Sequence, residues 1–190
     1  VFKVNFKGAR NVIPEGLDPL AGRCHFILGD DPDGWNTDVP RYGRLIYREL
    51  YEGIDLVYKT VPGGIKYEFL LEPGADVSDI RFEYEGARPR TDGQNIFMDT
   101  FSGTLADECL MAYQPTDGAR PCPARVVETG GAIGFEVDHD PELALVIDPL
   151  VVDDPNLSIA IAKIVESTDT ALSKLMSTDE LEVDLNEIAT

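Results

Sequence analysis

The stretch IKYEFL, residues 65–70, alternates apolar and charged side chains with a period of two. Successive side chains of an extended strand point to opposite faces of a sheet, so Ile65, Tyr67 and Phe69 are expected to face a core while the charged residues between them face water. Another largely apolar run, residues 54–59, precedes it across a Pro-Gly-Gly loop, a combination typical of tight turns. The two runs together predict a β-hairpin with one solvated face.

The same alternation recurs along most of the chain, and Gly or Pro interrupts it about every eight to twelve residues. That pattern predicts about ten short antiparallel strands, packed as a β-sandwich or a barrel-like domain. The further strands that we expect are residues 2–6, 24–28, 44–50, 80–85, 95–99, 104–113, 125–128, 133–137 and 143–151.

After Val152 the pattern changes to a helical period. Asp154-Pro155 is typical of an N-cap followed by Pro at the first helical position, and the segment 177–180 has the form of a capping box. We therefore expect a β-rich domain over residues 1–152 and an appendage of two amphipathic helices over residues 153–190. These helices would associate with the domain, with each other or with a second chain through Leu157, Ile161, Ile164, Leu172, Leu175, Leu181 and Leu185.

The charge balance is strongly acidic. The 190 residues include 16 Lys and Arg against 35 Asp and Glu, a formal net charge of −19. Such a surface repels nucleic acid and anionic lipid, so we expect no nucleic-acid partner. The sequence has no apolar run of about 18 residues, and we expect no direct insertion into a membrane. The charge suits divalent cations or a basic partner, or it serves solubility alone.

The acidic segment GDDPDGWNTDVP, residues 29–40, is the best metal candidate. Asp31, Asp33, Asn36 and Asp38 place oxygen ligands around a glycine bend, as Ca²⁺ coordination prefers. The spacing is not that of the twelve-residue calcium loop, and Asp and Asn also stabilise turns through their own backbone. A calcium site and a simple turn both remain open, and Ca²⁺ is the only cofactor that the sequence suggests.

Motifs of familiar enzymes are absent from the sequence, including Gly-x-Ser-x-Gly, the phosphate-binding Gly-rich loop and His-Glu-x-x-His. Cys24 and His25 are neighbours on an expected strand, point to opposite faces and cannot share a proton. His139 lies in a polar turn and is expected to be solvated. Paired carboxylates, as in glycosidases, would arise by chance among so many acids. We therefore expect no enzyme and keep a hydrolase only as a third hypothesis.

Two of the three cysteines, Cys109 and Cys122, flank an expected turn at residues 115–118. They would face each other if this turn closed a hairpin, and they could then form a disulfide. Free buried thiols are the alternative.

A series of motifs follows in order through the β-rich part: Gly29-Asp30-Asp31-Pro32, Trp35, Tyr51-Glu52-Gly53-Ile54-Asp55, Pro73-Gly74-Ala75-Asp76, Ala112-Tyr113-Gln114 and Ile147-Asp148-Pro149. In order and spacing they resemble the uncharacterised domain that precedes SBBP-type β-propeller repeats in secreted and cell-surface proteins of bacteria and archaea. The resemblance covers residues 1–152. It implies a β-rich extracellular module and brings no known catalytic residues.

The resemblance also bears on single residues. Asp55 and Asp148 are interpreted as structural, each accepting backbone N–H bonds at a strand end, and Trp35 is expected to fill the core beneath a turn. The family domain usually begins before the point that matches Val1. If those strands are missing, one sheet has an unpaired edge that another chain's strand could complete.

The first hypothesis is a non-enzymatic structural or adhesion module, extracellular or at the cell surface. It would be one subunit of an assembly completed by strand or helix exchange, with a second copy or another surface-protein chain as partner. The alternative is a calcium- or glycan-binding module, in which the aromatic contacts would be Trp35, Tyr42 and Tyr47.

Overall fold

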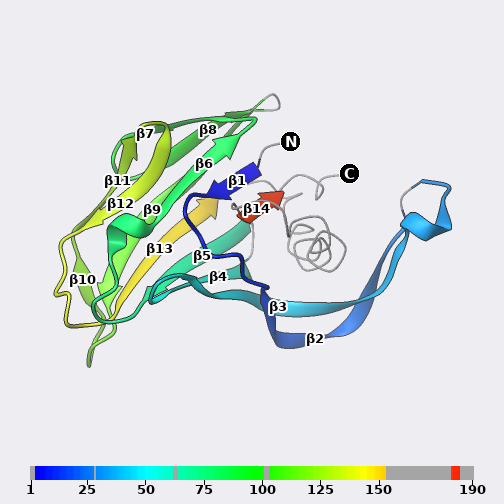
Figure 1. Cartoon of the computed structure of the whole chain (residues 1–190), viewed down its shortest axis with the longest axis horizontal. Helices are drawn as coiled ribbons and strands as arrows, with labels where there is room; N and C mark the ends of the chain where they lie inside the picture. Colours follow the sequence, from blue (N-terminus) through cyan, green and yellow to red (C-terminus); the bar gives the residue numbers. More distant parts are fainter. Residues whose placement is uncertain (1–2, 28, 62–63, 101–102, 153–180, 185–190) are drawn as a thin grey trace.

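The computed structural model describes residues 3–27, 29–61, 64–100, 103–152 and 181–184. They form two antiparallel sheets that pack face to face and do not close into a barrel (Figure 1). The mainly β, antiparallel architecture expected from the sequence is therefore confirmed. The helix expected over residues 157–175 lies outside the described residues.

The larger sheet has the strand order β2-β3-β4-β5-β13-β9-β8-β7, and β10 pairs with β9 beside this path. Its strands follow one another mostly through hairpins, except that β13 inserts between β5 and β9 near the end of the domain. The bounds are β2 (Glu15–Phe26), β3 (Asn36–Tyr51), β4 (Ile54–Val61), β5 (Gly64–Leu71), β7 (Arg88–Thr91), β8 (Ile96–Thr100), β9 (Gly103–Gln114), β10 (Arg120–Cys122) and β13 (Leu145–Val152).

The smaller sheet has the order β11-β12-β6-β1-β14. It joins the first strand of the described chain to the last one, since β1 lies between β6 and β14. The bounds are β1 (Lys3–Phe6), β6 (Arg81–Glu85), β11 (Ala124–Thr129), β12 (Ala132–Val137) and β14 (Leu181–Asp184).

The hairpin of β4 and β5 forms as its sequence predicts. Tyr67 and Phe69 lie on the inner face at 7% and 0% exposure, and residues 54–61 pair with residues 64–71 without a register shift. Lys66 and Glu68 lie on the outer face, as the period of two requires. The alternation of apolar and charged side chains therefore determines which face of this hairpin, at the centre of the larger sheet, packs in the core.

Four phenylalanine rings join the two sheets. Phe69 of the larger sheet lies 6.3 Å from Phe6 and 6.0 Å from Phe135, ring centroid to centroid. Phe82 is 5.9 Å from both Phe6 and Phe135. All four side chains are nearly or fully buried, and aromatic pairs at such distances add to the free energy of burial. This cluster is the centre of the sandwich.

The expected second helix is wrong at Leu181–Asp184. These residues form β14, which pairs antiparallel with β1 in the register Lys3↔Asp184 to Phe6↔Leu181. The Leu-Glu-Val-Asp sequence also alternates with a period of two, and the backbone of β1 offers unpaired N–H and C=O groups that a helix could not satisfy. Leu181 is therefore a strand residue, and Leu185 lies outside the described residues.

No helix within the described ranges is long and apolar enough to cross a membrane.

We expect Phe69→Ala to lower the free energy of unfolding by about 3–5 kcal/mol, the usual cost of a large buried side chain. Urea denaturation measures this change. Met111→Ala is the control, because Met111 is 54% exposed on β9, and it should alter stability by less than about 0.5 kcal/mol. Equal small effects of the two substitutions would contradict the assigned core.

Candidate functional site

The longest ribbon of the fold projects from the sandwich. β2 and β3 pair from Glu15↔Ile46 to Phe26↔Asn36, and Figure 1 shows their distal half running clear of both sheets to a separate tip. We call residues 17–43 the arm. Most side chains of β2 are exposed. A two-stranded ribbon outside a core is only marginally stable by itself, so the arm is a candidate for contact with another molecule.

The tip of the arm is a short 3-10 turn, η1 (Pro32–Gly34). Asp31 caps it, because its Oδ1 accepts the backbone N–H of Asp33 at 3.1 Å. The indole N–H of Trp35 donates to the carbonyl oxygen of Gly29 at 3.1 Å. The expectation that Trp35 fills the core is therefore wrong. It is half-buried and closes the tip locally, because the projecting strands carry the turn away from the sandwich.

The acids of the tip serve the turn and the ribbon. Asp38 has a φ of 63°, donates its backbone N–H to Nδ1 of His25 at 3.0 Å, and lies 4.0 Å from Arg23 through its carboxylate. Asn36 begins β3 opposite Phe26. Within the ranges that the structure describes, no three His, Cys, Asp or Glu side chains converge as metal ligands. Asp31, Asp33 and Asp38 of the predicted set therefore form no such group.

The three predicted aromatic contacts do not share a surface. The ring of Tyr42 covers Gly16 so closely that a Cβ at residue 16 would lie 2.5 Å from it. Tyr47 is 1% exposed and packs against Tyr58 at 6.1 Å between ring centroids. Its prediction as a ligand contact is wrong, because position 47 falls on the inner face of β3. Burial raises the pKa of its hydroxyl.

Apolar side chains on the arm are exposed. Leu20 is 45% and Ile27 is 59% exposed. The ribbon also has register shifts between Leu20 and Arg23 and between Cys24 and Phe26, and Asp18 has a φ of 56°. Bulges of this kind keep an edge strand from extending indefinitely into another sheet. The arm is therefore better suited to side-chain contact than to continuous strand addition.

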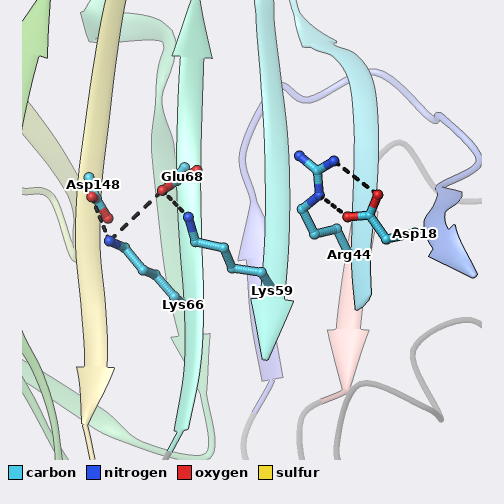
Figure 2. A network of polar contacts seen from close by, with 6 residues as sticks. All are labelled: Asp18, Arg44, Lys59, Lys66, Glu68 and Asp148. Atoms are coloured by element: carbon cyan, nitrogen blue, oxygen red, sulfur yellow. Dashed lines mark hydrogen bonds and ion pairs between the residues drawn. The ribbon is translucent and has the colours of Figure 1, made fainter. Parts of the chain in front are cut away.

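Two separate groups of charged side chains lie on the larger sheet, one at the base of the arm and one at the centre of the sheet (Figure 2). Asp18 of β2 pairs with Arg44 of β3 at 2.6 Å, and this hydrogen bond holds the pKa of the Asp18 carboxyl below its ordinary value. Further along, Glu68 accepts from Lys59 at 2.5 Å. Cross-strand pairs of opposite charge stabilise neighbouring strands modestly. The pair of Asp18 and Arg44 fixes the base from which the arm departs.

The central group ends at Asp148 of β13, where Nζ of Lys66 lies 2.6 Å from its carboxylate. Asp148 is 5% exposed, and its second carboxylate oxygen has no hydrogen-bond partner among the described residues. Among the described residues no backbone N–H donates to this carboxylate, so its structural role is the ion pair with Lys66 and not the backbone bonds that the sequence suggested. Burial, followed by the charges of Glu68 and Asp148, raises the pKa of Tyr113 beside them.

Asp55 of β4 lies beside the bulge of β3. Its Oδ1 accepts the backbone N–H of Glu49 at 2.7 Å, and Glu49 has a φ of 52°. The carboxylate therefore holds a strained turn of backbone next to the register shift between Tyr47 and Tyr51. Arg48 lies 3.7 Å from the other oxygen of Asp55. This is the corner role that the sequence suggested.

Asp107 is the charged group that sequence reasoning missed. It is 3% exposed in β9, and Tyr67 donates its hydroxyl hydrogen to Oδ2 at 2.5 Å. Burial raises the pKa of the Asp107 carboxyl to about 7, and the hydrogen bond of Tyr67 offsets only part of that rise. Tyr58 packs on Tyr67 at 6.0 Å between ring centroids. The carboxyl is thus a titrating group inside a tyrosine cluster.

A groove of about 820 Å³ lies at one end of the sandwich, beside the 3-10 turn η2 (Val77–Asp79). Two of its three lining carboxylates, those of Asp76 and Glu136, are engaged. Asp76 caps η2 by accepting from the N–H of Ser78 at 2.9 Å, a bond that lowers its pKa, and Glu136 is paired with Arg125. Glycoside hydrolysis requires two carboxyl groups that face each other across a cleft, and with Asp76 and Glu136 engaged this groove gives the hydrolase hypothesis no support.

Two further predicted residues lie near this end of the domain. His139 is half-buried, and its Nδ1 lies 3.0 Å from the carbonyl oxygen of Val137. Cys122 is a free thiol and pairs in register with Ala112 of β9, three residues beyond Cys109. Cys122 is therefore not bonded to Cys109, because the strand register places Ala112 opposite Cys122.

Comparison with protein families matches residues 1–150 to a domain of unknown function, DUF7948, and the chain belongs to that family. No curated protein and no solved structure matches the chain. Membership agrees with the resemblance to an uncharacterised domain over most of the chain, and it assigns no activity.

We expect Asp107→Asn to flatten the pH dependence of stability. The folded pKa of about 7 exceeds the ordinary value of 3.8, so the folded chain holds this proton more tightly. Wild-type stability should fall as the pH rises from about 4 to about 7, by up to roughly 4 kcal/mol. Asparagine is neutral throughout and avoids that loss.

Urea denaturation between pH 4 and pH 8 measures the slope for both chains. Asp117→Asn, at an exposed turn, is the control and should follow the wild type. Parallel slopes for the wild type and Asp107→Asn would show that the carboxyl does not titrate in this range.

Proposed function

We propose that this DUF7948 domain is a non-enzymatic extracellular structural module that joins neighbouring copies in a surface assembly through the arm. The observation that carries the proposal is the projection of the arm from the sandwich, with Leu20 and Ile27 exposed upon it. Exposed apolar side chains on an element without a core of its own favour contact with another chain. The resemblance to domains of secreted and cell-surface proteins supports the extracellular address.

The arm has an anchored base and a free end, as a contact element needs. The ion pair of Asp18 and Arg44 and the ring of Tyr42 over Gly16 hold the base. Toward the tip, the cross-strand neighbours are Arg23↔Pro40 and Phe26↔Asn36, in a stretch where most residues are exposed. Contact with a second chain would order this end at little entropic cost, because its base is already fixed.

A second copy is the simplest partner. Identical arms can meet across a two-fold axis, where each residue contact occurs twice and closes the assembly. The formal charge of −19 opposes close approach of two copies at low salt. Association should therefore strengthen as ionic strength rises, up to the point where screening is complete.

We expect Leu20→Lys combined with Ile27→Lys to raise the dissociation constant for self-association at least tenfold, because charges would replace apolar contact on the arm. Sedimentation velocity over a concentration series at physiological salt measures it. Met111→Lys introduces the same side chain at a residue of similar exposure, 54%, on β9, and adds one positive charge where the double variant adds two. It should leave association unchanged.

All three chains should unfold at the same urea concentration, because the substituted residues are exposed. A wild-type chain that stays monomeric at millimolar concentration would overturn the proposal. An equal loss of association in the Met111 control would show that the arm is not the contact surface.

A further inference from the structure

We propose that β14 is an exchangeable strand, and that the edge of β1 accepts the β14 segment of a second copy of this chain. The inference rests on the proposed function and deepens it, because contact through the arm would bring the second copy within reach. Backbone hydrogen bonding along a sheet edge is the chemistry of recognition.

The accepting edge is formed without β14. Val4 and Phe6 of β1 are 6% and 2% exposed, and β1 pairs with β6 on its other side in the register Lys3↔Glu85 to Phe6↔Phe82. The N–H of Lys7 then donates to the carbonyl oxygen of Arg81 at 2.8 Å. Core packing and one neighbour therefore fix β1 in place, and its remaining edge is ready for an added strand.

The donated strand is short and has one neighbour. β14 comprises Leu181–Asp184, and it pairs with no other strand within the described residues than β1. A four-residue pairing at the end of a sheet opens readily, because few backbone hydrogen bonds hold it. The same register can form within one chain or between two chains, so the free energy of the pairing itself is the same in both arrangements.

The connection permits either arrangement. The sequence places about 28 residues, 153–180, between the end of β13 and the start of β14. Such a length of chain reaches up to roughly 90 Å when extended. A segment tethered to its own partner competes with free copies at an effective concentration that the connection sets, in the millimolar range for short linkers. A second copy competes once its local concentration approaches that value, as in a surface assembly held by arms.

A mixture of two single-cysteine chains tests the exchange. Lys3 and Asp184 are opposite each other in the register, so one chain carries Lys3→Cys and the other carries Asp184→Cys, each with Cys24, Cys109 and Cys122 changed to Ser. Under mild oxidation, a disulfide between these two chains forms only if β14 of one copy lies on β1 of the other. The heterodimer should rise at least tenfold above the control between about 1 µM and about 1 mM.

The control replaces Asp184→Cys with Glu85→Cys, because Lys3 and Glu85 are paired inside one sandwich and should give only background crosslinks. A chain with both Lys3→Cys and Asp184→Cys should close on itself at 1 µM. A heterodimer at the control level throughout, or failure of the double variant to close, would overturn the exchange. Melting curves confirm that each chain is folded.

Adding Leu20→Lys and Ile27→Lys to both single-cysteine chains separates this inference from the proposed function. If the arm brings copies together, the heterodimer should fall while the double variant still closes on itself. If the heterodimer persists with these substitutions, the role of the arm is contradicted, while the exchange of β14 is still supported.

Discussion

The contact of Phe69 with Phe6 and Phe135 is the interaction on which the rest of the structure depends. It joins the centre of the larger sheet to two strands of the smaller sheet. Each sheet hides one apolar face only while the other covers it, so this contact sets the distance and alignment of both. The position of β1 follows from it through Phe6, and so does the edge that β14 occupies. The base of the arm is fixed in the same way, because Leu45 and Tyr47 of β3 lie in the same core.

Local alternation was sufficient to predict the strands at the centre of the fold, because residues 54–61 and 64–71 pair as neighbours. It could not predict the outline of the arm. The early part of β2 contains Pro19, Gly16 and Gly22, residues that normally indicate turns, and it is a strand because β3 pairs with it. The identity of the partner strand is information that a local pattern does not contain.

The two largest errors have similar physical causes. The segment Leu181–Asp184 fits both a helical period and a period of two, and the free edge of distant β1 decides between them. The resemblance implies that Trp35 fills the core, yet the projecting ribbon carries its turn outside the sandwich. Asp107 was missed because β9 shifts register against β13 between Asp148 and Leu150. That bulge breaks the alternation that would have shown position 107 facing inward.

The molecule consists of a sandwich of two sheets, with β14 at the edge of the smaller one, and of the arm that projects from it. The central proposal is that the arm contacts a second copy. Hydrogen–deuterium exchange at low and high protein concentration tests this most directly, since contact slows the opening of backbone hydrogen bonds. The account predicts that amides of residues 17–27 and 36–43 gain protection as concentration rises, while the hairpin of β4 and β5 stays unchanged. Equal exchange of the arm at both concentrations would contradict it.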